Sequence, residues 1–344
     1  MQEEMLHFLS LYASTFPQRK HIRIVACTNV STGWEGELLS IELEYEEGGE
    51  RGNAAVILKL YYGQSGIDKA EREFHSLQLL AQAHYPVPRV LFSALNDSPF
   101  GRAAVAMEKI QGDTAAHIFD NAPQERQQVL ITQCCQLYVD LHTLDWQPLV
   151  PDPAIYQTKD VISSRLAQIV TSSEQQLPGV FEPVIQWLQN RSPEISRRRL
   201  SIFHGDFHLN NLIVRDDGAL FVIDWTGTDL SDYRFDLGWT LLLLRTQNSE
   251  ELAERVLKEY ERLAGHSIEQ LEFFEVLACL KRLFEITLSL KSGTALLGIK
   301  PEAVKEIKQQ IHHIQAVYAQ LQQRTACSLP EIEKLVLASG EQTD

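Results

Sequence analysis

The chain has 344 residues, of which 44% are hydrophobic and 22% charged, as in a globular protein long enough for two lobes. Its net charge of −15 argues against a general nucleic-acid binder and is compatible with a cationic small-molecule partner. The five cysteines show no CxxC spacing, which argues against a disulfide framework or a zinc site and favours a reducing cytoplasm.

The N-terminal stretch carries acidic residues before its apolar part, whereas a signal peptide begins with basic ones. The apolar run at 239–244 is far too short to cross a bilayer. We therefore expect a cytoplasmic protein that does not bind a membrane.

The first third of the chain predicts a small sheet with two helices. Phe8 and Tyr12 recur at helical spacing within residues 3–16, Pro17 ends that helix, and a second helical pattern covers 68–83. Runs rich in β-branched and aromatic residues predict five antiparallel strands. These strands are 21–28, 37–45, 54–62, 89–94 and 103–107, with turn clusters at 29–36 and 46–53.

After residue 107 the pattern becomes mainly helical. A long helical run covers 123–144, two more precede Arg199, and residues 235–340 are almost wholly helical. Three short strand-like runs interrupt the helices, at 200–203, 211–214 and 219–223. The sequence thus predicts an α+β protein in which a small antiparallel lobe joins a large helical lobe. Ligand sites usually lie in the cleft of such a join.

The short runs carry a spaced set of polar residues. His-Gly-Asp-Phe-His-Leu-Asn-Asn occupies 204–211 and Val-Ile-Asp-Trp follows at 222–225, so that Asp206, Asn211 and Asp224 are five and thirteen residues apart. Phosphoryl transfer needs one carboxylate to align a hydroxyl, and an amide and a second carboxylate to hold Mg²⁺. The same offsets separate the Asp and Asn of H-R-D-x-x-x-x-N from the Asp of D-F-G in protein kinases.

Together with Phe-Asp-Leu-Gly at 235–238 and Leu-His-Thr-Leu-Asp-Trp at 141–146, these motifs resemble the aminoglycoside phosphotransferase and choline kinase group of the protein-kinase-like superfamily. The resemblance covers about residues 21–290. It implies a two-lobed protein-kinase-like fold and a kinase that uses Mg²⁺ and ATP or GTP. It also implies an N-terminal helix at 1–20 and the following parts: a nucleotide-binding lobe at 21–107, a hinge at 108–112 and a helical lobe at 113–344, with the catalytic loop at 204–211 and a metal-binding segment at 222–236.

Within this resemblance, Asp206 matches the catalytic Asp, which orients the substrate hydroxyl and accepts its proton. Asn211 and Asp224 match the metal-binding pair. His204 is expected to support the loop, and Asp236 to cap it from below. The ordinary alternative is that these residues only make turns and strand ends. For this alternative to be correct, the spacings from Asp206 to Asn211 and from Asn211 to Asp224 must both match the kinase pattern by chance.

The nucleotide contacts begin with Lys59, which lies late in an apolar strand and is costly there unless paired. Its partner in the family pattern is a helix carboxylate, for which we expect Glu73, fourteen residues on, with Glu71 as the competitor. The alternative is an edge-strand lysine that faces water.

Two weaker patterns complete the expected nucleotide site. Thr32 and Gly33 lie in a glycine-containing turn whose amides could approach phosphates, although an ordinary hairpin turn explains it equally well. Residues 105–112 resemble the hinge, where backbone groups of Glu108 and Ile110 would contact the base and Met107 would pack nearby.

Two features favour a small-molecule acceptor. Gly205 stands where many regulated protein kinases have Arg. Asp236 comes only twelve positions after Asp224, with no Ala-Pro-Glu after it. The acceptor site should lie near the segment after Asp224, where an aromatic–acidic group could hold an ammonium. The members of this group would be Trp225, Asp229, Asp232, Tyr233 and Trp239, although the two tryptophans suit core packing better.

The predicted function is therefore ATP- and Mg²⁺-dependent phosphorylation of a hydroxyl on an aminoglycoside, an amino sugar, choline or a similar molecule. A nucleotide-binding regulator without transfer activity and a protein kinase are the alternatives. The regulator is disfavoured because groups at 59, 206, 211 and 224 are all present.

Overall fold

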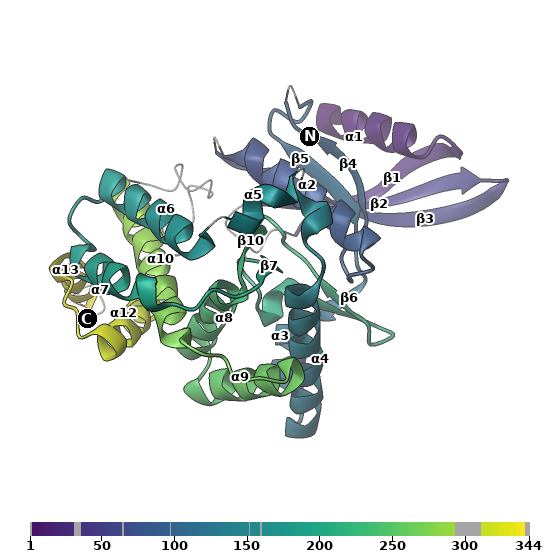
Figure 1. The fold of residues 1–344 in the computed structure, drawn as a ribbon. Helices are drawn as coiled ribbons and strands as arrows, with labels where there is room; N and C mark the ends of the chain where they lie inside the picture. Colours follow the sequence, from purple (N-terminus) through teal and green to yellow (C-terminus); the bar gives the residue numbers. More distant parts are fainter. Residues whose placement is uncertain are drawn as a thin grey trace. The chain divides into compact units, whose positions relative to one another are not determined.

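The computed structural model describes residues 2–30, 36–63, 65–96, 98–150, 152–158, 160–292 and 311–340. The chain forms two compact units (Figure 1). Of the described residues, the first unit contains those up to Thr114 together with 212–227, and the second contains 115–211 and the remainder from Thr228 onward. The catalytic loop thus belongs to the second unit, and the expected metal-binding segment is divided after Gly227.

The first unit is built on a five-stranded antiparallel sheet in the order β1-β2-β3-β5-β4. The strands are β1 (Arg19–Asn29), β2 (Gly36–Glu47), β3 (Glu50–Tyr61), β4 (Val90–Ala94) and β5 (Ala104–Glu108). The predicted strand count and direction are confirmed, but the turn cluster at 46–53 was placed too widely. The turn is two residues, Gly48 and Gly49 with φ of 64° and 89°, as a tight hairpin turn of this hand demands.

Strands β1, β2 and β3 extend beyond their predicted ends, because the polar residues at these ends still pair across the sheet. Arg51 lies opposite Glu46 in the β2–β3 register, and Arg19 Nε donates to Glu47 Oε2 at 3.1 Å across β1 and β2. Such pairs of opposite charge stabilise a sheet without any apolar alternation. A search for β-branched and aromatic residues therefore stops short of the true strand ends.

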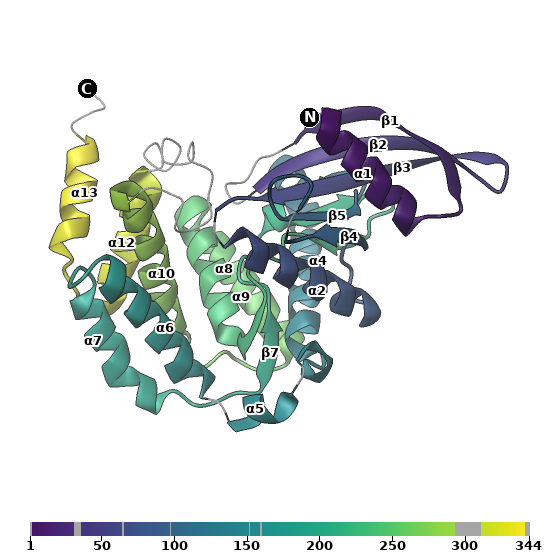
Figure 2. The same cartoon turned by 90° about the horizontal axis from the view of Figure 1, so that it is seen from above.

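Alternation along β3 directs its side chains to both faces of the sheet, and Figure 2 shows the backbones of the first two helices beside that sheet. Val56, Leu58 and Leu60 share a buried cluster with Phe8 of α1 (Gln2–Thr15). Residues one position along point to the other face, where Lys59 meets Glu73 of α2 (Gly66–Gln82). Each helix therefore covers one face of the sheet, and the face under α2 carries the polar residues.

A second, three-stranded sheet belongs to the first unit. It has the order β6-β8-β9, from β6 (Gly112–Thr114), β8 (Leu212–Arg215) and β9 (Leu220–Val222). Val222 N donates to Pro86 O at 2.9 Å, which ties β9 to the segment after α2. Strand β9 therefore delivers the residues that follow it, Ile223 and Asp224, to the first unit.

The second unit is mainly helical, as predicted, and the described part of the chain contains no helix long and apolar enough to cross a membrane. Helix α8 (Tyr233–Gln247) runs through it with residues 234–244 all buried. The other described helices are α3 (Ala115–Asn121), α4 (Gln124–Thr143), α5 (Pro153–Thr158), α6 (Val161–Gln176), α7 (Glu182–Arg191), α9 (Glu250–Ala264), α10 (Leu271–Ser292), α12 (Ile311–Thr325) and α13 (Pro330–Gly340).

One two-stranded sheet brings the catalytic loop to α8. Strand β7 (Leu200–Phe203) pairs antiparallel with β10 (Asp229–Asp232), which leads directly into α8. The loop at 204–211 leaves the end of β7. A polar strand such as Asp-Leu-Ser-Asp shows no apolar alternation, and this is why the sequence did not predict β10 or its pairing.

Candidate active site

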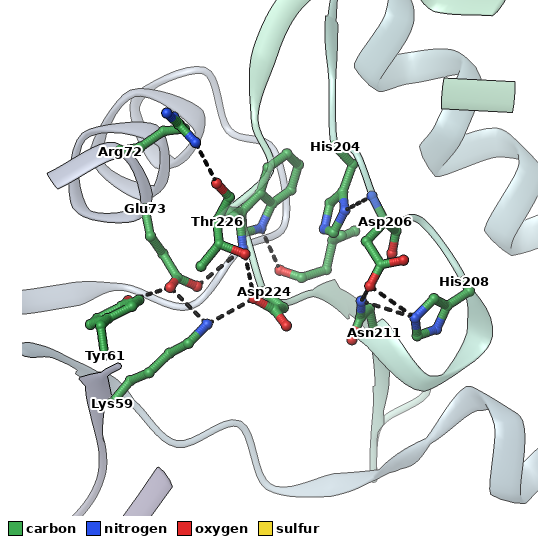
Figure 3. Close-up of polar contacts among 12 residues, drawn as sticks. Lys59, Tyr61, Arg72, Glu73, His204, Asp206, His208, Asn211, Asp224 and Thr226 are labelled. Atoms are coloured by element: carbon green, nitrogen blue, oxygen red, sulfur yellow. Dashed lines mark hydrogen bonds and ion pairs between the residues drawn. The ribbon is translucent and has the colours of Figure 1, made fainter. Parts of the chain in front are cut away.

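Lys59 is the buried centre of an ion cluster in the first unit. Its side chain is 7% exposed, and its Nζ lies 2.8 Å from Glu73 Oε2 and 2.7 Å from Asp224 Oδ1 (Figure 3). The predicted contact between Lys59 and Glu73 is therefore present, whereas the competitor Glu71 is exposed. The ammonium faces two carboxylates, so a lysine inside an apolar strand has the partners that its burial requires.

The protonation of Lys59 follows from this arrangement. Burial alone would lower its pKa, but the charges of Asp224 and Glu73 and their hydrogen bonds act in the opposite direction and hold the pKa above its ordinary value. The cluster keeps its ammonium at neutral pH. With two carboxylates against one ammonium, it can also accept a further cation.

Glu73 is fixed through both oxygens. Tyr61 Oη donates to Oε2, and the backbone N of Trp225 donates to Oε1 at 3.0 Å (Figure 3). Tyr61 is not among the site residues that the sequence predicts, although it lies two residues after Lys59 and therefore on the same face of β3. Its phenol holds the carboxylate that positions the ammonium.

Asp224 has an unusual backbone. Its φ is 65°, in the left-handed region that few residues other than glycine adopt, and Asp is among those that tolerate it best. Thr226 Oγ1 donates to Asp224 Oδ1 at 3.1 Å, the same oxygen that contacts Lys59. Backbone conformations of this kind persist where the surrounding contacts enforce them, often at functional sites.

In the second unit, the Asp206 carboxylate is held by hydrogen bonds on both oxygens. Trp239 Nε1 donates to Oδ1 at 2.8 Å, and Oδ2 lies 3.2 Å from His208 Nε2 and 3.3 Å from Asn211 Nδ2 (Figure 3 shows the Oδ2 side). Despite these contacts the side chain is 43% exposed. Asp206 is therefore both fixed in direction and reachable.

The same contacts decide the ionisation of Asp206. Burial would raise its pKa, but the hydrogen bond and charge of His208 and the hydrogen bond from Trp239 outweigh it and hold the pKa well below its ordinary value. The group is a carboxylate across the physiological range. A weakly basic carboxylate suits alignment of a hydroxyl and late acceptance of its proton.

Asn211 is oriented by the same loop. Its Nδ2 donates to the backbone O of Asp206 at 2.9 Å, and its backbone N donates to His208 O at 2.8 Å. Because the amide nitrogen is engaged with the loop, the amide oxygen is the atom left to serve as a ligand. Asn211 is the last residue before β8, which carries the chain into the first unit.

The loop rests on Asp236, which is fully buried. Asp236 accepts hydrogen bonds from His204 N at 2.7 Å and Gly205 N at 2.9 Å, so it caps the loop as predicted. His204 is also fully buried, and its Nδ1 accepts from Asp206 N at 3.2 Å, a supporting contact. Gly205 has a φ of 86°, which explains why this position takes glycine.

His142 supports Asp236 from the other side. Its Nε2 lies 3.3 Å from Asp236 Oδ2, and its Nδ1 lies 2.7 Å from Tyr260 Oη. In the sequence, the motif at 141–146 contributes only to the family resemblance. The structure gives it a physical function, since the imidazole fixes the residue that fixes the loop.

The other expected nucleotide contacts stay predictions. Thr32 and Gly33 lie outside the described residues. Met107 and Glu108 end β5, and Ile110 follows it, but the Glu108 N–H already donates to Arg89 O at 2.9 Å. The backbone carbonyl of Glu108 is therefore the group of this residue that could accept a hydrogen bond from the nucleotide base.

The residues considered for an ammonium site are mostly engaged elsewhere. Trp225 is fully buried and its Nε1 donates to Val222 O, which agrees with a core role. Asp229 pairs with Arg165 at 2.9 Å and Asp232 pairs with the buried Arg234 at 2.7 Å. The carboxylates are neutralised, so the aromatic–acidic group considered from the sequence loses its acidic part.

The model of a phosphotransferase enzyme family matches residues 43–273, more than half of the chain. This match confirms the resemblance drawn from the motifs and the predicted enzyme class, a small-molecule kinase.

Two curated relatives match in part. The chain is 27% identical over 211 residues to acyl-CoA dehydrogenase family member 10 of Mus musculus, covering 56% of this chain and 20% of that protein. It is 28% identical over 197 residues to acyl-CoA dehydrogenase family member 11 of Gallus gallus, covering 54% and 25%. The chain spans a quarter or less of these relatives.

Solved structures share the fold over nearly the whole chain. A Ralstonia eutropha JMP134 protein assigned as an aminoglycoside phosphotransferase has a TM-score of 0.63 at 16% identity, covering 92% of this chain and 98% of that one. The streptomycin–ATP–APH(2″)-IIa complex has a TM-score of 0.56 at 18% identity, covering 90% and 96%. A choline/ethanolamine kinase family protein from Mesorhizobium loti has 0.56 at 12%, covering 91% and 92%. The predicted two-lobed protein-kinase-like fold is confirmed.

Proposed function

The chain belongs to the phosphotransferase enzyme family, and from that premise we propose that it transfers the terminal phosphoryl group of ATP or GTP to a hydroxyl of a small molecule with the help of Mg²⁺. The observation that carries the proposal is the Lys59 cluster. A buried ammonium held by Glu73 and Asp224 is the charge arrangement that kinases use to bind nucleotide phosphates. A structural relative has been solved with ATP, which supports the nucleotide donor.

The donor set fits Mg²⁺. The described residues form no group of three or more His, Cys, Asp and Glu side chains that could hold a metal, and Mg²⁺ is usually bound by one or two protein oxygens plus phosphates and water. We assign the Asp224 carboxylate and the Asn211 amide oxygen as its protein ligands. The ion would neutralise charge on the nucleotide phosphates.

Asp206 serves the acceptor in this proposal. Its fixed and partly exposed carboxylate accepts a hydrogen bond from the acceptor hydroxyl, aligns the oxygen and takes its proton late in the transfer. Lys59 holds phosphate oxygens, Glu73 holds Lys59, and Tyr61 holds Glu73. Of the predicted nucleotide contacts, Thr32, Gly33, Met107, Glu108 and Ile110 complete the proposal.

A small-molecule acceptor is favoured by the short chain between Asp224 and Asp236. The described structure fills that segment with the Thr226 contact, strand β10 and the start of α8, which leaves no room for a long peptide-binding segment. Candidate acceptors are aminoglycosides, amino sugars, choline and related alcohols.

A transfer assay tests the proposal. Purified protein is incubated with γ-labelled ATP or GTP, with and without Mg²⁺, against a panel of small hydroxyl compounds and against casein. We expect Mg²⁺-dependent labelling of at least one small molecule and none of casein. Labelling of casein alone would identify a protein kinase, and Mg-nucleotide binding without transfer to any compound would identify the non-catalytic alternative.

A further inference from the structure

Two neighbouring residues of α2 hold the main chain that follows Asp224 in the first unit (Figure 3). Glu73 Oε1 accepts a hydrogen bond from Trp225 N at 3.0 Å. Arg72 Nη1 donates to Thr226 O at 3.0 Å. A carboxylate takes an N–H and a guanidinium takes the next carbonyl along, so both hydrogen bonds are charge-assisted. The chain directly after Asp224 is therefore attached to α2 at two successive residues.

These attachments follow directly on a strained residue. Asp224 has a φ of 65°, and a left-handed conformation of this kind persists only where the surrounding structure enforces it. Before Asp224, strand β9 is tied down through Val222 N, which donates to Pro86 O at 2.9 Å. After Asp224, the chain is held by Arg72 and Glu73. Loss of either attachment on the second side would allow the backbone of Asp224 to relax.

Arg72 differs from Glu73 in its exposure. Glu73 is buried and also holds Lys59, whereas Arg72 is an exposed residue of α2. Exposed contacts of charged side chains add little to the stability of a fold. The contact from Arg72 to Thr226 therefore bears chiefly on where the chain after Asp224 lies.

Thr226 passes this restraint to the Asp224 carboxylate. Its carbonyl is held by Arg72, and its Oγ1 donates to Asp224 Oδ1 at 3.1 Å. The same Oδ1 lies 2.7 Å from Lys59 Nζ, and the Asp224 side chain is 36% exposed. The carboxylate is thus accessible to a ligand, and its direction depends on Arg72 through one intervening residue.

We propose that Arg72 is a positioning residue for the metal-binding carboxylate: by holding Thr226 O, it keeps Asp224 in the conformation that presents its carboxylate to Mg²⁺. This inference rests on the proposed function and adds a residue to its metal site. Mg²⁺ demands nearly ideal octahedral geometry, so a carboxylate that loses its direction binds the ion more weakly although its charge is unchanged. Arg72 acts through Thr226 and needs no contact with the ion or with the phosphates.

Calorimetry on the whole chain tests this role without turnover. Binding of a non-hydrolysable ATP analogue is measured in EDTA and at increasing Mg²⁺ concentration. We expect Arg72→Gln to raise the Mg²⁺ concentration at half-saturation about fivefold, somewhat less than is usual for a residue bonded directly to a metal ligand. Affinity in EDTA should stay the same. Arg51→Gln, the same loss of charge at an exposed position at the far end of β3 from Lys59, is the matched control and should change neither value.

A double-mutant cycle shows whether Arg72 acts through Asp224. In the Asp224→Asn background, Arg72→Gln should change Mg-nucleotide affinity by less than about twofold, because the carboxylate that it positions is gone. An undiminished effect in that background, or an equal loss of affinity in EDTA, would show that Arg72 binds the phosphates directly and would overturn the inference. A wild-type Mg²⁺ dependence in Arg72→Gln would overturn it as well.

Hydrogen exchange gives a readout without metal or nucleotide. Because the Trp225 amide is bonded to Glu73, loosening of this segment should speed its exchange. We expect faster exchange over residues 223–227 in Arg72→Gln and unchanged exchange there in Arg51→Gln. Faster exchange with an unchanged Mg²⁺ dependence would reduce the contact to a structural one and overturn the inference. If the Mg²⁺ dependence shifts as expected but no hydroxyl compound is phosphorylated, the positioning role stands and the proposed transfer fails.

Discussion

The Lys59 cluster and the Asp206 loop both hold carboxylates, but they hold them by different means. In the first unit, the Lys59 ammonium lies between Glu73 and Asp224 at 2.8 and 2.7 Å; Lys59 and Glu73 are enclosed, while the Asp224 side chain is 36% exposed. In the second unit, Asp206 is held by side-chain hydrogen bonds and stays 43% exposed. An ion cluster binds charge, whereas a directed and exposed carboxylate aligns a hydroxyl. The two regions should therefore fail differently when mutated.

The largest expected effect is that of Asp206→Ala on the rate. We expect phosphoryl transfer to fall by about a hundredfold or more, because the group that positions the hydroxyl is lost, while nucleotide affinity stays within severalfold. The measurement is kcat with the acceptor found in the panel, alongside calorimetric binding of Mg-ATP. Asp140→Ala, at an exposed position of α4, is the matched control. Wild-type turnover in the purified Asp206 variant would refute the assignment.

The complementary change is Asp224→Asn in the first unit. We expect Mg-ATP affinity to fall about tenfold, about 1.4 kcal/mol, since the cation loses a carboxylate ligand and Lys59 keeps only Glu73 as a charged partner. Asn211→Ala should weaken binding less, because an amide gives the cation less than a carboxylate. Calorimetry with and without Mg²⁺ measures both. An unchanged Mg-dependent affinity in Asp224→Asn contradicts the metal assignment.

The sequence predicted the parts of these regions that depend on short spacing. Asp206 and Asn211 lie five residues apart within one loop, so their spacing alone places them close together. The Lys59–Glu73 contact follows from the predicted fold, because α2 must pack against the sheet that contains β3. The ends of the hairpin and the strands β6 and β10 were not predicted. Their residues are polar, and pairing between polar strands leaves no apolar alternation to detect.

Contacts between distant segments were also beyond the sequence. Trp239 is buried, in agreement with the expected core role, but its indole N–H also donates to Asp206, 33 positions away. The Arg282–His313 contact depends on the relative rotation of α10 and α12, which no local pattern specifies. Tyr61 could have been found, since the period of two along β3 places it beside Lys59.

Trp239→Phe sharpens the comparison at the Asp206 loop. A smaller aromatic ring remains beside Lys281, but the hydrogen bond to the carboxylate is lost. We expect kcat to fall about tenfold, about 1.4 kcal/mol of transition-state stabilisation, with nucleotide KM unchanged.

The pH profile separates this positioning effect from simple packing. The Trp239 N–H stabilises the ionised form of Asp206, so its loss raises the Asp206 pKa, and the acid limb of kcat/KM should move to higher pH. Trp187→Phe on α7 is the control. Equal effects of the two substitutions, or an unmoved acid limb, would leave Trp239 with packing alone.

The smallest expected effect concerns the stability of the fold in acid. In the first unit Lys59 pairs with carboxylates, whereas in the second unit Arg282 donates to the neutral imidazole of His313. The pKa of His313 is about 4 when folded, below the ordinary 6.5, so the unfolded chain binds a proton between these values that the folded chain does not. Stability from this group is complete above pH 6.5 and is lost as the pH falls toward 4, by at most about 1.4 kcal/mol per pH unit. His313→Gln, whose amide oxygen can still accept from Arg282, should flatten the dependence of the unfolding free energy on pH in this window. Urea unfolding at pH 7, 6 and 5 measures the slope, and parallel curves for variant and wild type would show that His313 is protonated in the fold, contrary to its contact with Arg282.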